Sequence, residues 1–310
     1  MRLATERVCA VAETLGSRGN QVAAVCARYL LRIRERFFPR TQFATLPVIG
    51  RLIPLLLRNA RSSVVENVHG HRMFVDANDS MGLSIDTAFE PLETQFCSQT
   101  VKPGQTVVDI GANIGYYTLL FAKAAGPSGR VFAFEPDPDN YRLLSANVTA
   151  NGYANVTLVQ AAVSNRAGDV ILYRNDMNRM DHRTYDPGGT CERVVVPSLR
   201  LDEDLAAHGG RVDFVKMDIQ GSEPAALGGM LRVLANNPAI TLVTEFWPHG
   251  LTRAGHDPAG FLEQLAQLGF AMRRIDERRH EIVATSAREL LGAYDPGDRW
   301  AATNIICTRE

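Results

Sequence analysis

Residues 107–118 read VVDIGANIGYYT, an apolar run that passes through a glycine-rich turn into a helical pattern. The β-branched pair at its start is typical of a strand buried on both faces. The glycines permit left-handed backbone angles and let a ligand lie against the main chain without a Cβ between them. A strand, a glycine turn and a helix start together predict a nucleotide-type site at the carboxyl end of a parallel strand. The turn residues are Gly111, Asn113 and Gly115.

The next predicted strand, residues 130–134, is followed by an acidic residue. Glu135 stands directly after that strand and 20 residues after Gly115. A carboxylate at this spacing accepts hydrogen bonds from the ribose hydroxyls of a nucleotide cofactor. NAD and S-adenosylmethionine both carry such a ribose, so the glycine turn has to distinguish between them.

The turn favours S-adenosylmethionine over a dinucleotide. A G-x-G-x-x-G fingerprint would place glycine at positions 113 and 116, where this chain has Asn113 and Tyr116. The pyrophosphate of a dinucleotide needs the close backbone approach that glycine allows, whereas the amino-acid half of S-adenosylmethionine does not. We expect Asp109 to meet the ammonium group of that half, directly or through water.

Several motifs resemble those of one enzyme family. The turn segment, FAFEPDPDNY (132–141) and VDFVKMDIQGSE (212–223) are similar to the FkbM-type class I methyltransferases, and so are FEPLETQF (89–96) and VKPGQ (101–105). Linked motifs in order and at sensible spacing are far more specific than any one of them. The resemblance implies O-methylation, commonly of hydroxyls on sugars or other secondary metabolites.

The expected fold is α/β: a Rossmann-like class I methyltransferase fold with a doubly wound, mostly parallel sheet of seven strands. Strand and helix patterns alternate from residue 105 to 275, including a single helix over 222–235. A further helix is predicted over 85–100, and a final strand is predicted at 302–307. A β-hairpin is predicted at 64–75, with His69 and His71 in its turn. The residues expected at the cofactor are Asp109, Gly111, Asn113, Gly115, Tyr117, Thr118, Glu135, Pro136 and Ala161.

The composition is that of an ordinary globular protein. The 310 residues are 45% hydrophobic and 22% charged. Five scattered cysteines form no C-x-x-C pair, so neither a zinc site nor a disulfide framework is indicated, and a reducing cytoplasm is expected. The acidic residues near the N-terminus do not fit a signal peptide.

Charge is divided unevenly along the chain. Residues 1–62 hold 11 Arg and 3 Glu, a balance of +8, which leaves −9 for residues 63–310. We therefore expect a basic, mostly helical segment over 1–62 and a methyltransferase domain over 63–310. Residues 43–57 are apolar but too short and too interrupted by proline and arginine to span a bilayer. This stretch could lie at a membrane surface, line a homodimer contact or pack on the catalytic domain, and residues 28–58 are the candidate for peripheral membrane contact.

Catalytic candidates stand where the central strands end. Methyl transfer from a sulfonium requires an aligned acceptor and often a base. Asp218 follows the strand 212–217, and Glu245 follows the next strand, so the two carboxylates could orient a hydroxyl, remove its proton or hold a metal. Two carboxylates alone are weak evidence for a metal site, and no metal ligand is predicted. Lys216 is either catalytic or paired with a buried carboxylate, while Glu223 fits the first turn of a helix, a structural role.

A polar segment at 174–192 interrupts the alternation between strands predicted at 168–173 and 193–196. Loops on a rigid scaffold often carry binding residues. His182 in this segment is a candidate base because histidine titrates near neutral pH.

Two other functions stay open at this stage. The basic arm favours a nucleic-acid methyltransferase, but the acidic catalytic part and the lack of an N-P-P-Y-type motif argue against nucleic acid as the acceptor. A non-catalytic cofactor-binding interaction protein is the other alternative. The retention of Asp109, Glu135, Asp218 and Glu245 together argues against it.

Overall fold

The computed structural model describes residues 63–84, 86–175 and 178–309. The chain divides into two compact units, Met1–Phe89 and Glu90–Glu310. The helical segment, the membrane-contact stretch and the domain boundary expected within residues 1–62 lie outside the described residues. Among the described helices, none is long and apolar enough to cross a membrane.

In the first unit, β1 (Val64–Val68) and β2 (His71–Phe74) form the predicted antiparallel hairpin. His69 lies in the turn with a left-handed φ of 52°. The placement of His71 in the turn was wrong, since it is the first residue of β2 and is buried. Its Nδ1 lies 3.2 Å from the Val68 carbonyl oxygen.

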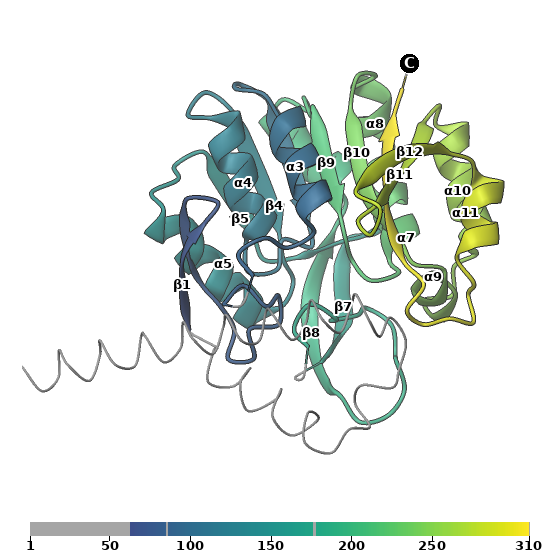
Figure 1. The fold of residues 1–310 in the computed structure, drawn as a ribbon, viewed down its shortest axis with the longest axis horizontal. Coiled ribbons are helices and arrows are strands. Elements are labelled where there is room, and N and C mark those ends of the chain that lie inside the picture. Colours follow the sequence, from purple (N-terminus) through teal and green to yellow (C-terminus); the bar gives the residue numbers. More distant parts are fainter. Residues whose placement is uncertain (1–62, 85, 176–177, 310) are drawn as a thin grey trace, which may run out of the picture. The chain divides into compact units, whose positions relative to one another are not determined.

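The second unit is built on one mostly parallel sheet, which confirms the predicted fold class (Figure 1). Its strand order is β12-β11-β13-β10-β9-β3-β4-β5. Five neighbouring strands, β10, β9, β3, β4 and β5, run parallel, while β13 and β12 are antiparallel to their neighbours. The strands are β3 (Thr106–Ile110), β4 (Arg130–Phe134), β5 (Val156–Val159), β9 (Phe214–Met217), β10 (Thr241–Phe246), β11 (Ala271–Asp276), β12 (Glu281–Thr285) and β13 (Thr303–Thr308).

The sheet has eight strands where seven are predicted. The additional strand is β12, which pairs with β11 at the edge. Its residues are mostly exposed, so the segment lacks the apolar periodicity of a buried strand.

Helices flank the sheet on both sides (Figure 1). Alternate residues of the central strands, such as Val108, Phe132 and Val215, join one large core with residues of α7, α8 and α10. The intervening residues, among them Asp109 and Lys216, therefore point to the opposite face of the sheet. The helices are α3 (Pro91–Thr100), α4 (Tyr116–Ala125), α5 (Pro138–Ala150), α6 (Leu201–Asp204), α7 (Glu223–Gly228), α8 (Leu231–Asn236), α9 (Pro248–Arg253), α10 (Pro258–Gln267) and α11 (Ala287–Ala293), with a 3₁₀ turn at Leu205–His208.

Two helix boundaries differ from the sequence-based expectation. The helix predicted over 85–100 begins at Pro91, because proline suits the first turn and the preceding Glu90 has a left-handed φ of 43°. Glu277 caps this helix by accepting hydrogen bonds from the amides of residues 92 and 93. The single helix predicted over 222–235 is divided into α7 and α8 at Gly229, where a Cβ would meet the Ser164 carbonyl oxygen at 2.0 Å.

A second, three-stranded sheet has the order β6-β8-β7. Its strands are β6 (Ala162–Val163), β7 (Gly168–Arg174) and β8 (Glu192–Leu199), which confirms strands on both sides of the predicted polar segment. An isolated bridge between Tyr173 and Arg183 fastens part of the intervening loop to β7.

Candidate functional site

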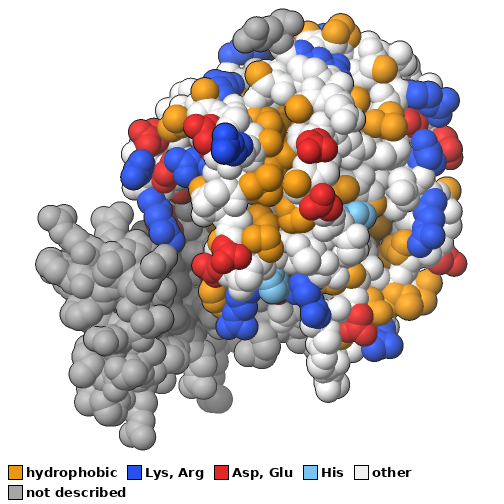
Figure 2. All heavy atoms as spheres, turned by 90° about the vertical axis from the view of Figure 1, so that its right-hand side faces the viewer, with side chains coloured by type: hydrophobic (Ala, Val, Ile, Leu, Met, Phe, Trp, Pro, Cys, Tyr) orange, Lys and Arg blue, Asp and Glu red, His pale blue; other side chains and the backbone are white. Residues whose placement is uncertain are grey.

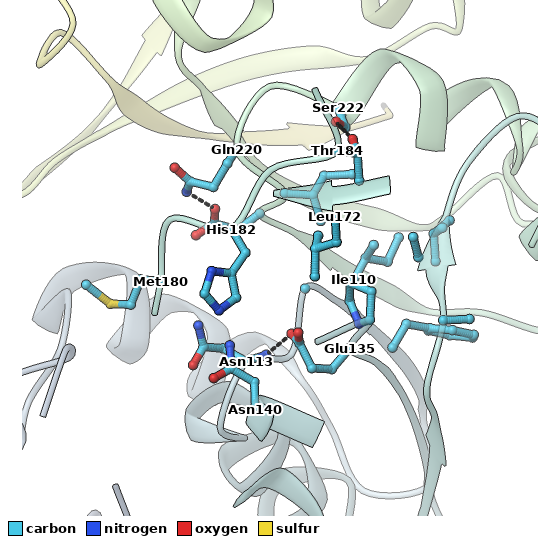
Figure 3. Close-up of a pocket in the computed structure, with 18 of the residues that line it drawn as sticks. Ile110, Asn113, Glu135, Asn140, Leu172, Met180, His182, Thr184, Gln220 and Ser222 are labelled. Atoms are coloured by element: carbon cyan, nitrogen blue, oxygen red, sulfur yellow. Dashed lines mark hydrogen bonds between the residues drawn. The ribbon is translucent and has the colours of Figure 1, made fainter. Parts of the chain in front are cut away.

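A cavity lies beyond the carboxyl ends of β3, β4 and β9 (Figure 3). Its empty space, including the solvent at its mouth, is about 560 Å³. The position agrees with the rule that α/β sheets bind ligands at the carboxyl ends of their strands. The lining includes Gly111, Asn113, Glu135, Pro136, Asn140, Ala161, Leu172, Met180, His182, Asp218 and Gln220.

The glycine turn at the end of β3 brings two loops into contact. Gly111 has a left-handed φ of 81°, and a Cβ at this position would meet the Asp218 carbonyl oxygen at 2.1 Å. The main chain after β3 can therefore lie against the main chain after β9 only with glycine here. This contact places Asp218 at the wall of the same cavity as the glycine turn.

Glu135 holds the turn by its carboxylate. Its two oxygens accept hydrogen bonds from the amides of Asn113, at 2.8 Å, and Asp137, at 2.9 Å. The side chain is nearly inaccessible to solvent, and burial raises the pKa of Glu135 to about 8 although these two amides act in the opposite direction.

Five of the nine expected cofactor residues line the cavity, namely Gly111, Asn113, Glu135, Pro136 and Ala161. The other four do not. Asp109 points toward α4, where its Oδ2 accepts a hydrogen bond of 2.6 Å from the Thr118 hydroxyl. The Tyr117 hydroxyl donates to Glu90, and Gly115 is the N-cap of α4. Asp109 and its neighbours on α4 thus hold the strand and helix together beneath the turn.

The loop 178–184 crosses the cavity and is fastened at both ends. The Arg179 carbonyl oxygen accepts hydrogen bonds from the side-chain amides of Asn113 and Asn140. At the other end, the Thr184 hydroxyl is hydrogen-bonded to that of Ser222. His182 lies between these points and lines the cavity.

The surroundings of His182 do not suit a general base. Its Nδ1 accepts a hydrogen bond of 3.0 Å from the Asn175 amide, so the neutral ring carries its proton on Nε2. Burial lowers the pKa of His182, which favours that neutral ring. No lone pair of the ring is left to take a proton from an acceptor.

Lys216 is the centre of a buried charge cluster. Its Nζ lies 3.5 Å from Glu93 Oε1, 3.6 Å from Asp218 Oδ2 and 4.3 Å from the centre of the Tyr117 ring. Burial lowers the pKa of Lys216, but the surrounding carboxylates outweigh burial and raise it above its ordinary value. Lys216 therefore remains charged and fits a positioning role, not that of a base.

Gln220 connects the two candidate carboxylates. Its side-chain amide donates to Asp218 at 2.9 Å and to Glu245 at 3.4 Å. Asp218 lines the cavity, whereas Glu245 is outside the lining. Burial, followed by the charge of Asp218, raises the pKa of Glu245 well above its ordinary value. Burial therefore disfavours the ionised form of Glu245.

Glu223 begins α7, as predicted, and braces the loop that carries Asp218. Its carboxylate oxygens accept hydrogen bonds from the amides of Ile219 and Gly221, at 3.0 and 2.9 Å. Among the described residues, no group of three or more His, Cys, Asp or Glu side chains is arranged to hold a metal ion.

Sequence reasoning missed Glu90 and Glu93 as members of this cluster. Glu93 is fully buried against Lys216, and Glu90 receives hydrogen bonds from Tyr117 and Asn304. Burial, followed by the nearby Glu93, raises the pKa of Glu90 to about 8. Both glutamates belong to FEPLETQF, and two acidic residues on either side of a helix start were the available signal.

A family profile described as the methyltransferase FkbM domain matches residues 109–272, which is more than half of the chain. The chain belongs to the FkbM methyltransferase family. This confirms the resemblance found in the motifs, and the cofactor of the family is S-adenosylmethionine. A second profile, described as protein-L-isoaspartate(D-aspartate) O-methyltransferase, matches residues 51–165.

Two curated methyltransferases match part of the chain. The 31-O-demethyl-FK506 methyltransferase FkbM of Streptomyces tacrolimicus is 43% identical over 163 residues, 42% of this chain and 61% of that protein. Methyltransferase sdnD of Sordaria araneosa is 28% identical over 155 residues, 40% of this chain and 60% of that protein. The chain therefore spans about three fifths of each relative. A solved SAM-dependent O-methyltransferase of Thermotoga maritima aligns with 84% of this chain and 81% of its own, with 15% identity and a TM-score of 0.40.

Glu135→Ala is expected to weaken S-adenosylmethionine binding by this FkbM family member at least tenfold. Loss of hydrogen bonds between a carboxylate and ribose hydroxyls costs about 1.5–3 kcal/mol, which is one to two decades of affinity. Titration calorimetry measures the change, with Glu203→Ala, an exposed glutamate on α6, as the matched control. Unchanged affinity in Glu135→Ala would remove this residue from the site.

The stability of the cofactor-free protein is expected to fall between pH 5 and pH 8, in part through Glu135. The folded-state pKa of about 8 exceeds the ordinary value of 4.5. The stabilisation is complete below the unfolded-state pKa and is lost as the pH rises through the folded-state pKa. Glu135→Gln, which is neutral throughout, is expected to flatten the profile. Urea unfolding at pH 5, 6.5 and 8 measures both proteins, and parallel profiles would contradict the prediction.

Proposed function

We propose that this protein transfers a methyl group from S-adenosylmethionine to a hydroxyl on a small molecule, sugar, glycoconjugate or secondary metabolite. The observation that carries the proposal is the position of Asp218. It lines the cavity that the glycine turn and Glu135 also line, and its other side adjoins the charge cluster around Lys216.

The residues around the cavity fit the cofactor. Gly111 leaves room at the main chain where a Cβ would clash, and Glu135 offers its carboxylate to ribose hydroxyls. When bound, S-adenosylmethionine supplies a methyl group made electrophilic by its sulfonium. This chain contributes alignment of the acceptor and removal of its proton.

Asp218 is the group that we assign to the proton of the acceptor hydroxyl. Its carboxylate is fixed on one oxygen by the Gln220 amide and on the other by the Lys216 ammonium, 3.6 Å away. Burial raises the pKa values of Glu90 and Glu245, and neither residue lines the cavity, so both are less suited to the same task.

The same cluster disfavours a carboxylate acceptor, such as the protein carboxyl named in the second profile. An anionic acceptor beside Asp218 would meet like charge, and like-charge contacts are costly in a desolvated site. A carboxylate also needs no base to release a proton. The arrangement therefore favours a neutral hydroxyl.

The face shown in Figure 2 does not favour the nucleic-acid alternative. On the face shown in Figure 2, Lys and Arg side chains lie around the margin with acidic side chains among them, not in one continuous track. Binding to a phosphate backbone depends on multiple basic contacts. Filter binding of RNA and DNA at two salt concentrations tests this alternative directly.

The proposed activity is tested with labelled methyl donor and a panel of acceptors. The panel contains hydroxylated metabolites and sugars, matched carboxylic acids and an isoaspartyl peptide. We expect label transfer to hydroxyl compounds, stable to mild base, whereas methyl esters of carboxylates are hydrolysed. Transfer confined to the carboxylates, or to RNA or DNA, would overturn the hydroxyl assignment.

A further inference from the structure

Two buried polar atoms on the cavity wall lack a hydrogen-bond partner within the described residues. They are His182 Nε2 and Asn140 Oδ1. The His182 side chain is 7% exposed, and Asn140 is 1% exposed. Both residues line the cavity, and in Figure 3 the His182 ring points toward Asn113 and Asn140. Leaving buried polar atoms unpaired costs free energy, so this pair indicates a ligand that completes it.

The first of the two atoms is a hydrogen-bond donor. His182 Nδ1 accepts from the Asn175 amide, which leaves the ring proton on Nε2. The Asp137 Oδ2 atom lies 3.8 Å from Nε2, beyond hydrogen-bond distance, and is engaged by Arg174 Nε at 2.7 Å. His182 therefore presents an N–H group without an acceptor among the described residues.

The second atom is a hydrogen-bond acceptor. The Asn140 amide nitrogen donates to the Arg179 carbonyl oxygen at 3.1 Å. A carbonyl oxygen accepts and cannot donate, so this bond fixes the orientation of the Asn140 amide. Its Oδ1 is thereby left as an acceptor on the same wall as the His182 donor.

We propose that His182 and Asn140 recognise the adenine edge of S-adenosylmethionine, an inference that rests on the function proposed above. Adenine places an amine donor beside a ring-nitrogen acceptor, the pattern that complements one acceptor and one donor of the protein. Asn140 Oδ1 accepts from the exocyclic amine, and His182 Nε2 donates to the adjacent ring nitrogen. Hypoxanthine has a carbonyl oxygen in place of the amine and a protonated N1, so it does not match this pair.

Hydrogen bonds connect Asn140 and the loop that carries His182 to Glu135, the residue expected to bind the ribose. The Arg179 carbonyl oxygen accepts hydrogen bonds from the side-chain amides of Asn140 and Asn113. The main-chain amide of Asn113 in turn donates to the Glu135 carboxylate. Asn140 lies in the first turn of α5, and the side chain of Asp137, the N-cap of this helix, accepts a hydrogen bond from the main-chain amide of Asn140. Apolar side chains complete the wall on which a base can lie; they are Phe134, Val163, Leu172 and Met180.

The test compares S-adenosylhomocysteine with S-inosylhomocysteine by titration calorimetry on the full chain. We expect the wild type to bind the adenine compound at least tenfold more tightly, because the inosine compound leaves buried groups unpaired. His182→Phe, which keeps a ring but removes the donor, is expected to reduce this ratio to below about threefold. His182→Gln, which restores an amide donor, is expected to retain most of it, and His256→Phe, at a residue outside the cavity lining, serves as the control.

Each outcome bears on a separate claim. Absence of S-adenosylhomocysteine binding to the wild type would contradict the proposed function itself. Equal binding of the two compounds by the wild type would overturn only the claim that His182 and Asn140 recognise adenine. This comparison does not depend on the folding of any variant. An unchanged ratio in folded His182→Phe would likewise overturn it, and would indicate that water satisfies the two atoms.

Discussion

Asp218→Asn is expected to lower methyl-transfer turnover at least a hundredfold, the low end for loss of a general base. The substitution keeps the shape of the side chain and removes its charge, so Asp218 could no longer take the acceptor proton. Cofactor affinity is expected to stay within about threefold, because the glycine turn and Glu135 are untouched. Single-turnover kinetics and calorimetry measure the two quantities separately.

The matched control is Asp213→Asn, at the opposite end of the same strand. Asp213 immediately precedes β9 and accepts a hydrogen bond from the Thr106 amide, away from the cavity lining. Its substitution is expected to change turnover by less than about threefold. Chelation of the wild type with EDTA distinguishes direct proton removal from a metal role. Full activity in Asp218→Asn would leave Glu245 as the next base to test.

The central sheet could be predicted because each buried parallel strand is a short apolar run. Residues 130–134 are predicted and observed as one strand with identical bounds. The exposed β12 carries no such pattern, and only its pairing with β11 makes it a strand. The following helix α11 did carry a readable signal, the Ser286 and Glu289 capping box.

Some residues of the candidate site could likewise be predicted from the sequence, and others could not. Asp218 and Glu135 could be placed because each follows a predicted strand, where the topology brings carboxyl ends together. Glu93 could not, because it lies 123 residues before Lys216 and meets it only when α3 packs beside the sheet. The tautomer of His182 depends on the backbone amide of Asn175, which no residue pattern reveals. The sequence pattern therefore predicted the functional groups at strand ends. It did not predict the groups whose positions depend on packing between distant parts of the chain.

Lys216→Met is expected to destabilise the protein by about 3–5 kcal/mol, because removal of one partner leaves a buried charge uncompensated. The uncompensated group is Glu93, which is fully buried and has no hydrogen bond to its carboxylate among the described residues. Methionine fills similar volume, so packing loss is small. For a protein of this size the change corresponds to a fall in Tm of roughly 6–20 °C.

The pH dependence and a second substitution distinguish charge from packing in Lys216→Met. Burial raises the pKa of Glu93, and the positive charge of Lys216 lowers it. Removal of Lys216 therefore raises the pKa of Glu93 further, so that Glu93 takes up a proton at higher pH. The deficit of the variant should therefore be smaller at pH 5 than at pH 8, since stabilisation by a raised carboxyl pKa is lost as the pH rises through it. Adding Glu93→Gln removes the buried charge and should recover most of the loss at pH 8. A double variant as unstable as Lys216→Met, with no pH dependence of the deficit, would assign the loss to packing and remove Glu93 and Lys216 from the electrostatic support of Asp218.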